Sequence, residues 1–322
     1  MKKKITLMLA FFTLSLGAFA QKEYKLAKSS GRLNINLPGA TIVGYSGKDI
    51  VFSAAVNEDD EEDLRAKGLK VINGSGFTDN SGLGIDVTVK GEDINVNSVG
   101  KKLDGAITIK VPENVKVIYK YSSTFNRDSV ILQNLKNEIE VSASYNSVKL
   151  LNNTGPMNVK TLYGSVDATF NADIKGPVSI VSVYGYVDVA VPTSVKANVE
   201  LATSYGNLYS ADGLKIDIDK TAAPAASEKP NTPITTNISK LTRTPSSTST
   251  TTSSSGSAVA VATGSANFQG KFTTSGISGD AQNISTVFYG TKEPETIKGK
   301  LNGGGADLIL KSNYKNVYLR SK

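Results

Sequence analysis

Tyr163-Gly164-Ser165-Val166-Asp167-Ala168 is followed in the chain by a close copy, Tyr184-Gly185-Tyr186-Val187-Asp188-Val189. Further copies begin at Tyr145, Tyr205 and Tyr314, so the first four tyrosines of the series are 18, 21 and 21 residues apart. After the tyrosine, β-branched residues or leucine alternate with other residues that are mostly polar. A repeat of this length that holds two or three short strands is typical of one coil of a parallel β-solenoid.

Each copy has the same order of residue types, a bend residue followed by an alternating strand. We expect the Gly or Asn after the tyrosine to make a bend, because these residues tolerate left-handed backbone geometry. The alternating residues then point inward, and stacked coils bury them as a continuous column. The predicted inward row is Val148, Val166, Val187 and Leu208. The alternative is an antiparallel β-sandwich, in which the Tyr-Gly segments are hairpin turns; the near-constant repeat favours the solenoid, with coils of about 20 residues.

The rest of the chain also favours strands over helices. Short alternating runs occur at residues 33–37, 85–90 and 107–111, and Gly, Asn, Asp or Pro bound them. This period of two is the strand signal. The one helical candidate, residues 58–67, is strongly acidic and has few apolar positions, so we expect a surface loop or a single turn. The sequence therefore predicts an all-β protein.

The first twenty residues predict export. Lys2, Lys3 and Lys4 precede an apolar stretch, residues 5–16, and the segment ends in Ala18-Phe19-Ala20. A basic start, a short apolar centre and an Ala-x-Ala end indicate a secretory signal peptide, residues 1–20. A transmembrane anchor would need about 20 apolar residues. We therefore expect an exported protein of the periplasm or cell surface, with no transmembrane segment after signal cleavage.

Composition divides the remainder into three parts. Residues 21–219 form a predicted β-strand repeat domain. Residues 220–262 are rich in Ser, Thr and Pro and predict a disordered linker. Residues 263–322 are expected to continue the same domain, because the copy at Tyr314 matches those before the linker. Gly303-Gly304-Gly305 lacks the frame of a phosphate-binding loop and is expected to make a tight turn.

The 322 residues include no Cys, His or Trp. The chain therefore has no thiol nucleophile, no disulfide and no histidine acid or base. A Ser-His-Asp triad and the usual zinc sites are excluded. The formal net charge of +7 falls to +4 once the three lysines of the signal peptide are removed. This mild charge, without a basic cluster, gives no indication of nucleic-acid binding. We predict no enzymatic activity, no cofactor and no metal.

The tyrosine series is the main candidate site. Tyr145, Tyr163, Tyr184, Tyr205 and Tyr314 are expected to form an aromatic ladder along one face. Such a ladder could bind sugar rings, because tyrosine combines an apolar ring with a polar tip. The same ladder could instead fix the register between coils, and the repeat by itself favours this second role.

Two carboxylates define a competing site. Asp167 and Asp188 occupy equivalent positions, so stacked coils would bring them together. Parallel β-helix polysaccharide lyases use calcium bound by aspartates, so the pair suggests calcium binding or acid–base chemistry. Lys149 in the previous copy and Tyr209 in the following one are the expected neighbours. A solvated, charged face explains this row more simply.

Several motifs of the chain have to be considered together. They are Leu37-Pro38-Gly39-Ala40, Gly44-Tyr45-Ser46-Gly47-Lys48-Asp49-Ile50-Val51, Ile109-Lys110-Val111-Pro112, the Ser-x-Tyr-Gly-x-Val repeats and Gly303-Gly304-Gly305 with Ser312-Asn313-Tyr314. With these motifs the chain resembles the adhesin-like, β-strand-repeat family of bacterial envelope proteins, described as auto-transporter adhesins of unknown function. The resemblance covers most of the chain outside the linker. It implies a solenoid-like β fold, export and no established catalytic or ligand residues.

These observations predict a non-catalytic, exported envelope protein that acts as an adhesin-like or scaffolding module. Its expected partner is a cell-envelope polysaccharide or another envelope protein. Two alternatives remain open. One is a calcium-dependent polysaccharide lyase or hydrolase built on a β-helix, and the other is a regulatory partner in envelope stress.

Deleting residues 221–262 should leave the fold intact. The segment is polar and broken by proline, and changing the length of a loop costs only about 0.6 kcal/mol per doubling. Circular dichroism and a thermal melt of the deletion variant would test this. Loss of the β signal or of the cooperative transition would show that the segment belongs to the folded domain.

Overall fold

The structure, a computed structural model, describes residues 21–55, 64–100, 103, 106–124, 128–171, 174–219 and 294–322. These residues belong to one of the two units into which the chain divides, residues 1–222 with 288–322. The predicted signal peptide, the predicted linker and the second unit, residues 223–287, lie outside the described residues.

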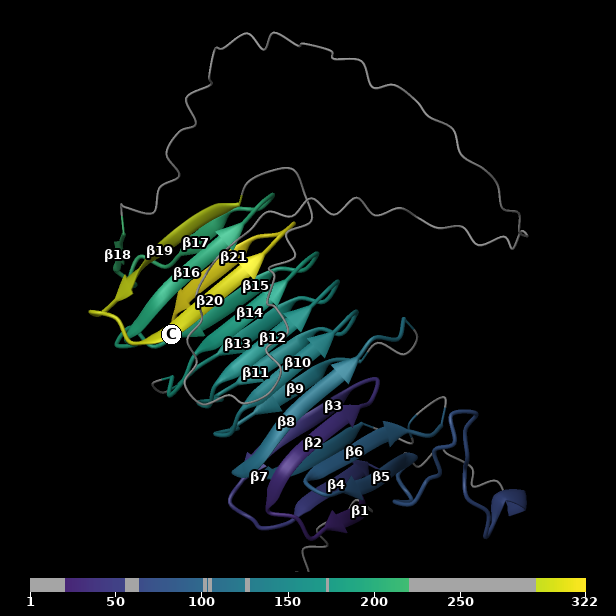
Figure 1. The fold of residues 1–322 in the computed structure, drawn as a ribbon. Helices are drawn as coiled ribbons and strands as arrows, with labels where there is room; N and C mark the ends of the chain where they lie inside the picture. Colours follow the sequence, from purple (N-terminus) through teal and green to yellow (C-terminus); the bar gives the residue numbers. More distant parts are fainter. Residues whose placement is uncertain are drawn as a thin grey trace, which may run out of the picture. The chain divides into compact units, whose positions relative to one another are not determined.

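The described residues form two large sheets that are mostly parallel, with no α-helix (Figure 1). Sheet A has the strand order β1 (Gln21–Leu26), β4 (Ile50–Ala55), β7 (Ile107–Pro112), β3 (Ala40–Tyr45), β9 (Val130–Gln133), β11 (Val148–Leu151), β13 (Val166–Thr169), β15 (Val187–Val191), β21 (Val317–Ser321) and β17 (Leu208–Ser210). Sheet B has the order β18 (Ile216–Ile218), β19 (Glu295–Leu301), β16 (Ala197–Thr203), β20 (Ala306–Ser312), β14 (Val178–Ser182), β12 (Met157–Thr161), β10 (Ile139–Ala143), β8 (Asn114–Tyr121), β2 (Ser30–Asn36), β6 (Asp93–Ser98) and β5 (Ile85–Lys90). A 3-10 turn, η1 (Leu64–Ala66), lies within the acidic candidate helix, whose first six residues are not described. The predicted all-β class is confirmed.

The chain alternates between the two sheets. From β10 to β15, each strand of sheet B is followed by a strand of sheet A, and we call such a pair a rung. Equivalent strands of neighbouring rungs pair in parallel, as β10, β12 and β14 do in sheet B. The Tyr-Gly segments therefore join the two sheets within one rung and do not turn between neighbours in one sheet. Among the named strands, every antiparallel pairing involves β1, β4, β5, β18 or β19.

Both sheets bury their inner faces in a single core. The predicted inward positions Val148, Val166 and Val187 are fully buried, and their parallel register continues to Val317. Facing them are rows from sheet B such as Val141, Val159, Ile180 and Leu310. Burying each such side chain contributes about 1.5–3 kcal/mol. Leu208 is only partly buried, because its strand β17 is the last in sheet A and no further rung covers it.

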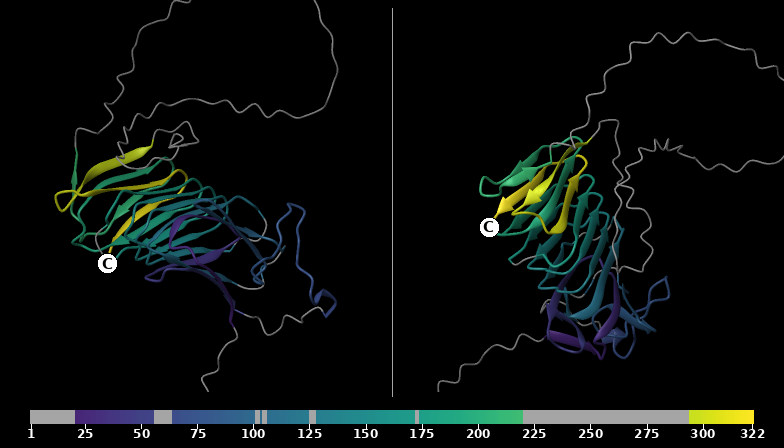
Figure 2. Two further views of the ribbon diagram at one scale, coloured as in Figure 1. Left: turned by 60° about the horizontal axis from the view of Figure 1, so that its bottom comes forward. Right: turned by 60° about the vertical axis from the view of Figure 1, so that its left-hand side comes forward.

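The last rung in the chain is not the last in space. Strand β20 lies between β14 and β16, and β21 lies between β15 and β17. Figures 1 and 2 show these C-terminal strands in yellow among the green strands of the preceding rungs. The C-terminal rung is inserted between two rungs that are consecutive in the sequence.

The N-terminal rung is inserted in the same way. Strand β2 lies between β6 and β8, and β3 lies between β7 and β9. At each end, two successive strands of one sheet also enclose a third. Strands β3 and β4 enclose β7, and β19 and β20 enclose β16; one flanking strand is parallel to the enclosed strand and the other antiparallel. The two ends of the repeat thus share one topology.

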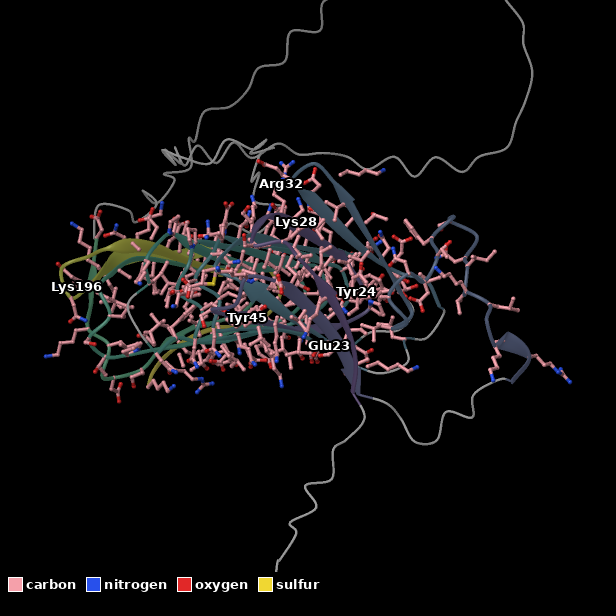
Figure 3. All side chains as sticks on the ribbon, turned by 90° about the horizontal axis from the view of Figure 1, so that it is seen from below. Glu23, Tyr24, Lys28, Arg32, Tyr45 and Lys196 are labelled. Atoms are coloured by element: carbon pink, nitrogen blue, oxygen red, sulfur yellow. The ribbon has the colours of Figure 1, made fainter. Side chains whose placement is uncertain are left out.

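Antiparallel strands cover three of the four sheet edges among the described residues. Strands β1 and β4 extend sheet A beyond β7, and the ring centroids of Tyr24 and Phe52 lie 6.0 Å apart. Figure 3 labels Tyr24 and Glu23 of β1. Strand β5 covers β6, and β18 with β19 covers β16. The fourth edge is β17, which is only three residues long. Short or covered edges limit pairing with other chains. No helix in the described part of the chain is long and apolar enough to span a membrane.

Replacing Val187 with Asp should destabilise the protein severely, because the charge would be buried without a partner between two neighbouring valines. We expect a loss of about 4 kcal/mol or more. Asp188→Asn is the matched control: its side chain points outward and pairs with the half-exposed Arg320, so the loss should be about 1 kcal/mol or less. Urea denaturation measures both. Equal losses would place Asp188 inside the core.

Candidate functional site

Five tyrosines form one continuous stack where sheet B passes into sheet A. We call Tyr145, Tyr163, Tyr184, Tyr314 and Tyr205 the tyrosine stack, in spatial order. Successive ring centroids lie 4.8, 4.9, 4.7 and 5.0 Å apart, with interplanar angles of 13° or less. The structure thus brings together all five candidate residues of the sequence. Tyr314 lies between Tyr184 and Tyr205 because the C-terminal rung is inserted there.

Backbone hydrogen bonds position the rings. The amide of Tyr163 donates to the carbonyl of Ser144, and the amide of Tyr184 donates to that of Leu162. In each case the acceptor is the residue just before the tyrosine of the neighbouring rung. Because the backbone repeats at the strand spacing, roughly 4.8 Å, the attached rings fall at the same spacing and meet face to face.

A row of buried hydroxyls runs beneath the stack. The final sheet B residue of four rungs is Ser or Thr and is fully or almost fully buried: Thr161, Ser182, Ser312 and Thr203. The Ser182 hydroxyl accepts from the amide of Gly185 at 2.9 Å and donates to the carbonyl of Gly164 at 2.8 Å. Equivalent bonds recur at the other three positions. Each hydroxyl therefore closes its own corner and links it to the neighbouring rung.

The glycines after the tyrosines serve close approach, which corrects the expectation of left-handed bends. Gly164, Gly185 and Gly206 are not in the left-handed region. A Cβ on Gly185 would lie 2.1 Å from the carbonyl oxygen of Gly164, and one on Gly206 would lie 2.2 Å from that of Lys315. Left-handed residues occur elsewhere: Asn152, just after β11, has φ of 57°, and Gly303 in the predicted tight turn has φ of 85°.

A second aromatic group lies beside the stack on sheet A. We call Tyr186, Tyr318 and Tyr209 the face cluster. Tyr209 stacks on Tyr318 at 5.1 Å, and Tyr186 meets Tyr318 edge-on at 6.5 Å. Asn316 and Asn207 donate to the hydroxyls of Tyr318 and Tyr209. Tyrosines thus extend from the corner onto the outer face of the last three rungs in space.

The carboxylate pair lies against this cluster. Asp167 and Asp188 are direct register partners, as their repeat positions predict. The row continues to Tyr318 and then Tyr209, so Tyr209 is not the immediate neighbour of Asp188. This difference again comes from the inserted rung. Among the described residues, no group of three or more acidic side chains is arranged to hold a metal.

Both carboxylates already accept hydrogen bonds. Arg320 holds Asp188 through two nitrogens at 2.7 and 2.8 Å, and its guanidinium carbon lies 5.2 Å from the centre of the Tyr318 ring. This hydrogen bonding raises the pKa of Arg320. Tyr186 donates to Asp167 at 3.3 Å, and partial burial together with the charge of Asp167 raises the pKa of Tyr186. The arrangement is a set of paired charges on an aromatic surface.

The sequence interpretation missed the hydroxyl row and the face cluster. A signal existed for both. Ser or Thr stands two residues before the tyrosine in four copies, and a second tyrosine stands four residues after Tyr205 and Tyr314. No sequence pattern indicated a role for Arg320, because its partner Asp188 belongs to a copy of the repeat that is far away in the sequence.

No protein-family model matches the chain, and no curated protein is significantly similar to it. A crystal structure of a Clostridium sporogenes protein, described as a "putative cell adhesion protein", aligns with 94% of this chain and 100% of that chain. The sequence identity is 14% and the TM-score is 0.36.

Ser182→Ala should lower the free energy of unfolding by about 1–3 kcal/mol, because it leaves the Gly185 amide and the Gly164 carbonyl without their partner. Ser182→Thr is the matched control, since Thr161 and Thr203 occupy the same position in other rungs. Urea denaturation gives the free energy of unfolding of both variants, and the two can be compared when the free energy falls with urea concentration at the same slope. An alanine variant as stable as the threonine variant would contradict the role assigned to the hydroxyl row.

Proposed function

We propose that the described residues form a two-sheet parallel β-solenoid and that the protein is a non-catalytic, exported binding module of the cell envelope. In this proposal, the tyrosine stack and the face cluster bind a linear polysaccharide. The observation that carries the proposal is the continuous stack of five tyrosines, three of which are exposed. Export rests on the predicted signal peptide.

Exposure supports a binding role. The exposed large hydrophobic side chains among the described residues number ten, and five of them belong to these two groups: Tyr163, Tyr184, Tyr186, Tyr205 and Tyr209. Each is between 37% and 48% exposed. A contiguous apolar surface with polar tips is characteristic of interaction sites.

The register between rungs does not depend on the exposed rings. The hydroxyl row and the close approach of Gly164, Gly185 and Gly206 to neighbouring carbonyls already fix it from beneath. Exposed tyrosines would therefore be replaceable by small polar residues if register were their sole purpose. Their concentration in one place favours an added role in binding.

The spacing of the stack favours a polysaccharide over an extended peptide. Its faces cover one another, so ring edges and hydroxyls meet the ligand at intervals of 4.7–5.0 Å. Side chains on one face of an extended peptide repeat at about 6.7 Å, twice the rise per residue. A sugar ring in a linear polysaccharide is close to the shorter interval, and its hydroxyl groups can bond to each phenol in turn.

The charged groups support binding over lyase chemistry. A calcium-dependent lyase would use Asp167 and Asp188, but Tyr186 and Arg320 already hold these carboxylates. The guanidinium of Arg320 stays protonated, as arginine does in proteins generally, so it does not supply a base. Held in this way, the two pairs brace the tyrosines of the face cluster.

Binding of the full chain to isolated cell-wall polysaccharides, measured by calorimetry, tests the proposal. Tyr163→Ala and Tyr184→Ala should each weaken binding by about 0.5–1.5 kcal/mol, or roughly two- to tenfold. Ile72→Ala is the matched control, because Ile72 is 73% exposed but lies far from the tyrosines in the sequence and outside both sheets. Wild-type protein that binds no polysaccharide, or tyrosine variants that bind as wild type does, would refute the proposal.

A further inference from the structure

We propose that the C-terminal segment, residues 294–322, can be donated by a second copy of this chain, giving a strand-exchanged dimer. The site that receives it is the slot between rung β14–β15 and rung β16–β17, which we call the exchange slot. This assembly is separate from the proposed polysaccharide binding, and either could hold without the other.

The topology of the slot is the first observation. Strands β20 and β21 pair on both sides with strands that precede them by more than 90 residues in the chain. Strand β19 pairs with the other side of β16, so the segment encloses this strand. All these contacts lie between the segment and residues 178–218, and none requires the two parts to belong to one molecule.

The second observation is how completely the slot matches the segment. Leu308, Leu310, Val317 and Leu319 are buried in the core rows. Ser312 donates to the Gly185 carbonyl from one side, and Thr203 donates to the Lys315 carbonyl from the other. On the surface, Tyr314 enters the tyrosine stack and Arg320 pairs with Asp188. The slot therefore selects this segment, which identifies the occupant as a copy of the same sequence.

The slot can also close without the segment. Ile180 and Leu201 both pair with Leu310, so they occupy equivalent positions on either side of it. Thr203 and Ser182 are likewise equivalent across Ser312. Rung β16–β17 therefore has the positions needed to pair directly with rung β14–β15. The rest of the chain thus has a folded state while its own segment lies in another molecule.

The connection to the segment is the third observation. Residues 220–293 join β18 and its following residue to the segment, and a chain of that length reaches at most about 250 Å. The advantage of insertion within one chain falls as the connection lengthens. The connection from the N-terminal rung and β4 to β5 is shorter, residues 56–84, and its Asn73 and Asn80 are bonded to strands β6 and β5. Exchange is therefore assigned to the C-terminal end.

Reciprocal exchange gives a closed dimer. Each chain would fill the slot of its partner with the same segment, so the two contacts are identical and related by a two-fold axis. No slot is left open in such a dimer, and growth into fibres is not required.

Inter-chain disulfide formation tests the proposal, because the natural chain has no cysteine. One full-length chain carries Ala190→Cys and a second carries Arg320→Cys; these residues are register partners on β15 and β21. The two chains are unfolded together, refolded at increasing protein concentration and then oxidised. We expect a disulfide-linked heterodimer whose yield rises with concentration and which elutes as a dimer in size-exclusion chromatography.

Two controls make the result decisive. Chains carrying Thr169→Cys and Ala190→Cys separately also place register partners on neighbouring strands, but neither residue lies in the segment. The disulfide yield of this pair therefore measures random collision between two folded chains alone. A single chain with both Ala190→Cys and Arg320→Cys should form the disulfide internally, which verifies the geometry.

A heterodimer in at least tenfold excess over the collision control establishes exchange. A yield equal to that control at every concentration, while the single-chain double variant forms its disulfide, overturns the proposal.

Discussion

Parallel hydrogen bonding places each residue of a rung directly beside its equivalent in the next, as Val148, Val166 and Val187 show. The core, the corners and the tyrosine surface all depend on this constraint. It turns a repeated apolar position into a buried column and a repeated tyrosine into a stack. It also brings the carbonyl of one corner so close to the next that only glycine fits after Tyr184 and Tyr205. One backbone spacing thus sets the core, the corner and the surface.

The repeat made these columns predictable from the sequence. Side chains alternate between the two faces of a strand, so a residue that recurs at the same position of each copy must recur on the same face of the sheet. Both the inward valines and the stacked tyrosines could therefore be predicted from the spacing of the copies. The order of the rungs did not follow. The rungs that carry a tyrosine share nearly the same motif, and Val317 and Leu208 occupy the same repeat position, so the motif alone does not say which of them pairs with Val187. Sequence similarity between rungs makes their neighbours interchangeable, and only the whole structure selects one order.

The glycine positions show a different limit. Gly and Asn are equivalent as residues that tolerate left-handed geometry, and the sequence alone could not separate that role from close approach. The structure assigns left-handed geometry to Asn134 and Asn152 after the sheet A strands, and close approach to Gly164 and Gly185 after the tyrosines. The distinction depends on the distance to a neighbouring rung, which is a tertiary quantity. Local sequence patterns contain no information about that distance.

Because the rungs are interchangeable, the exposed sheet edges at the two ends of the array have to be protected from pairing. A repeat whose units fit any neighbour would pair with other chains at each exposed edge. Antiparallel strands prevent this on three edges, because they do not offer the parallel register that the next rung needs. The remaining edge, β17, is short. The inserted first and last rungs of the chain add a second constraint. Each is hydrogen-bonded to a neighbouring rung on both sides, so neither of them lies at an edge of the array where unpairing could begin. The topology therefore limits pairing between copies of the chain to the exchange slot, where the matching segment of either copy fits.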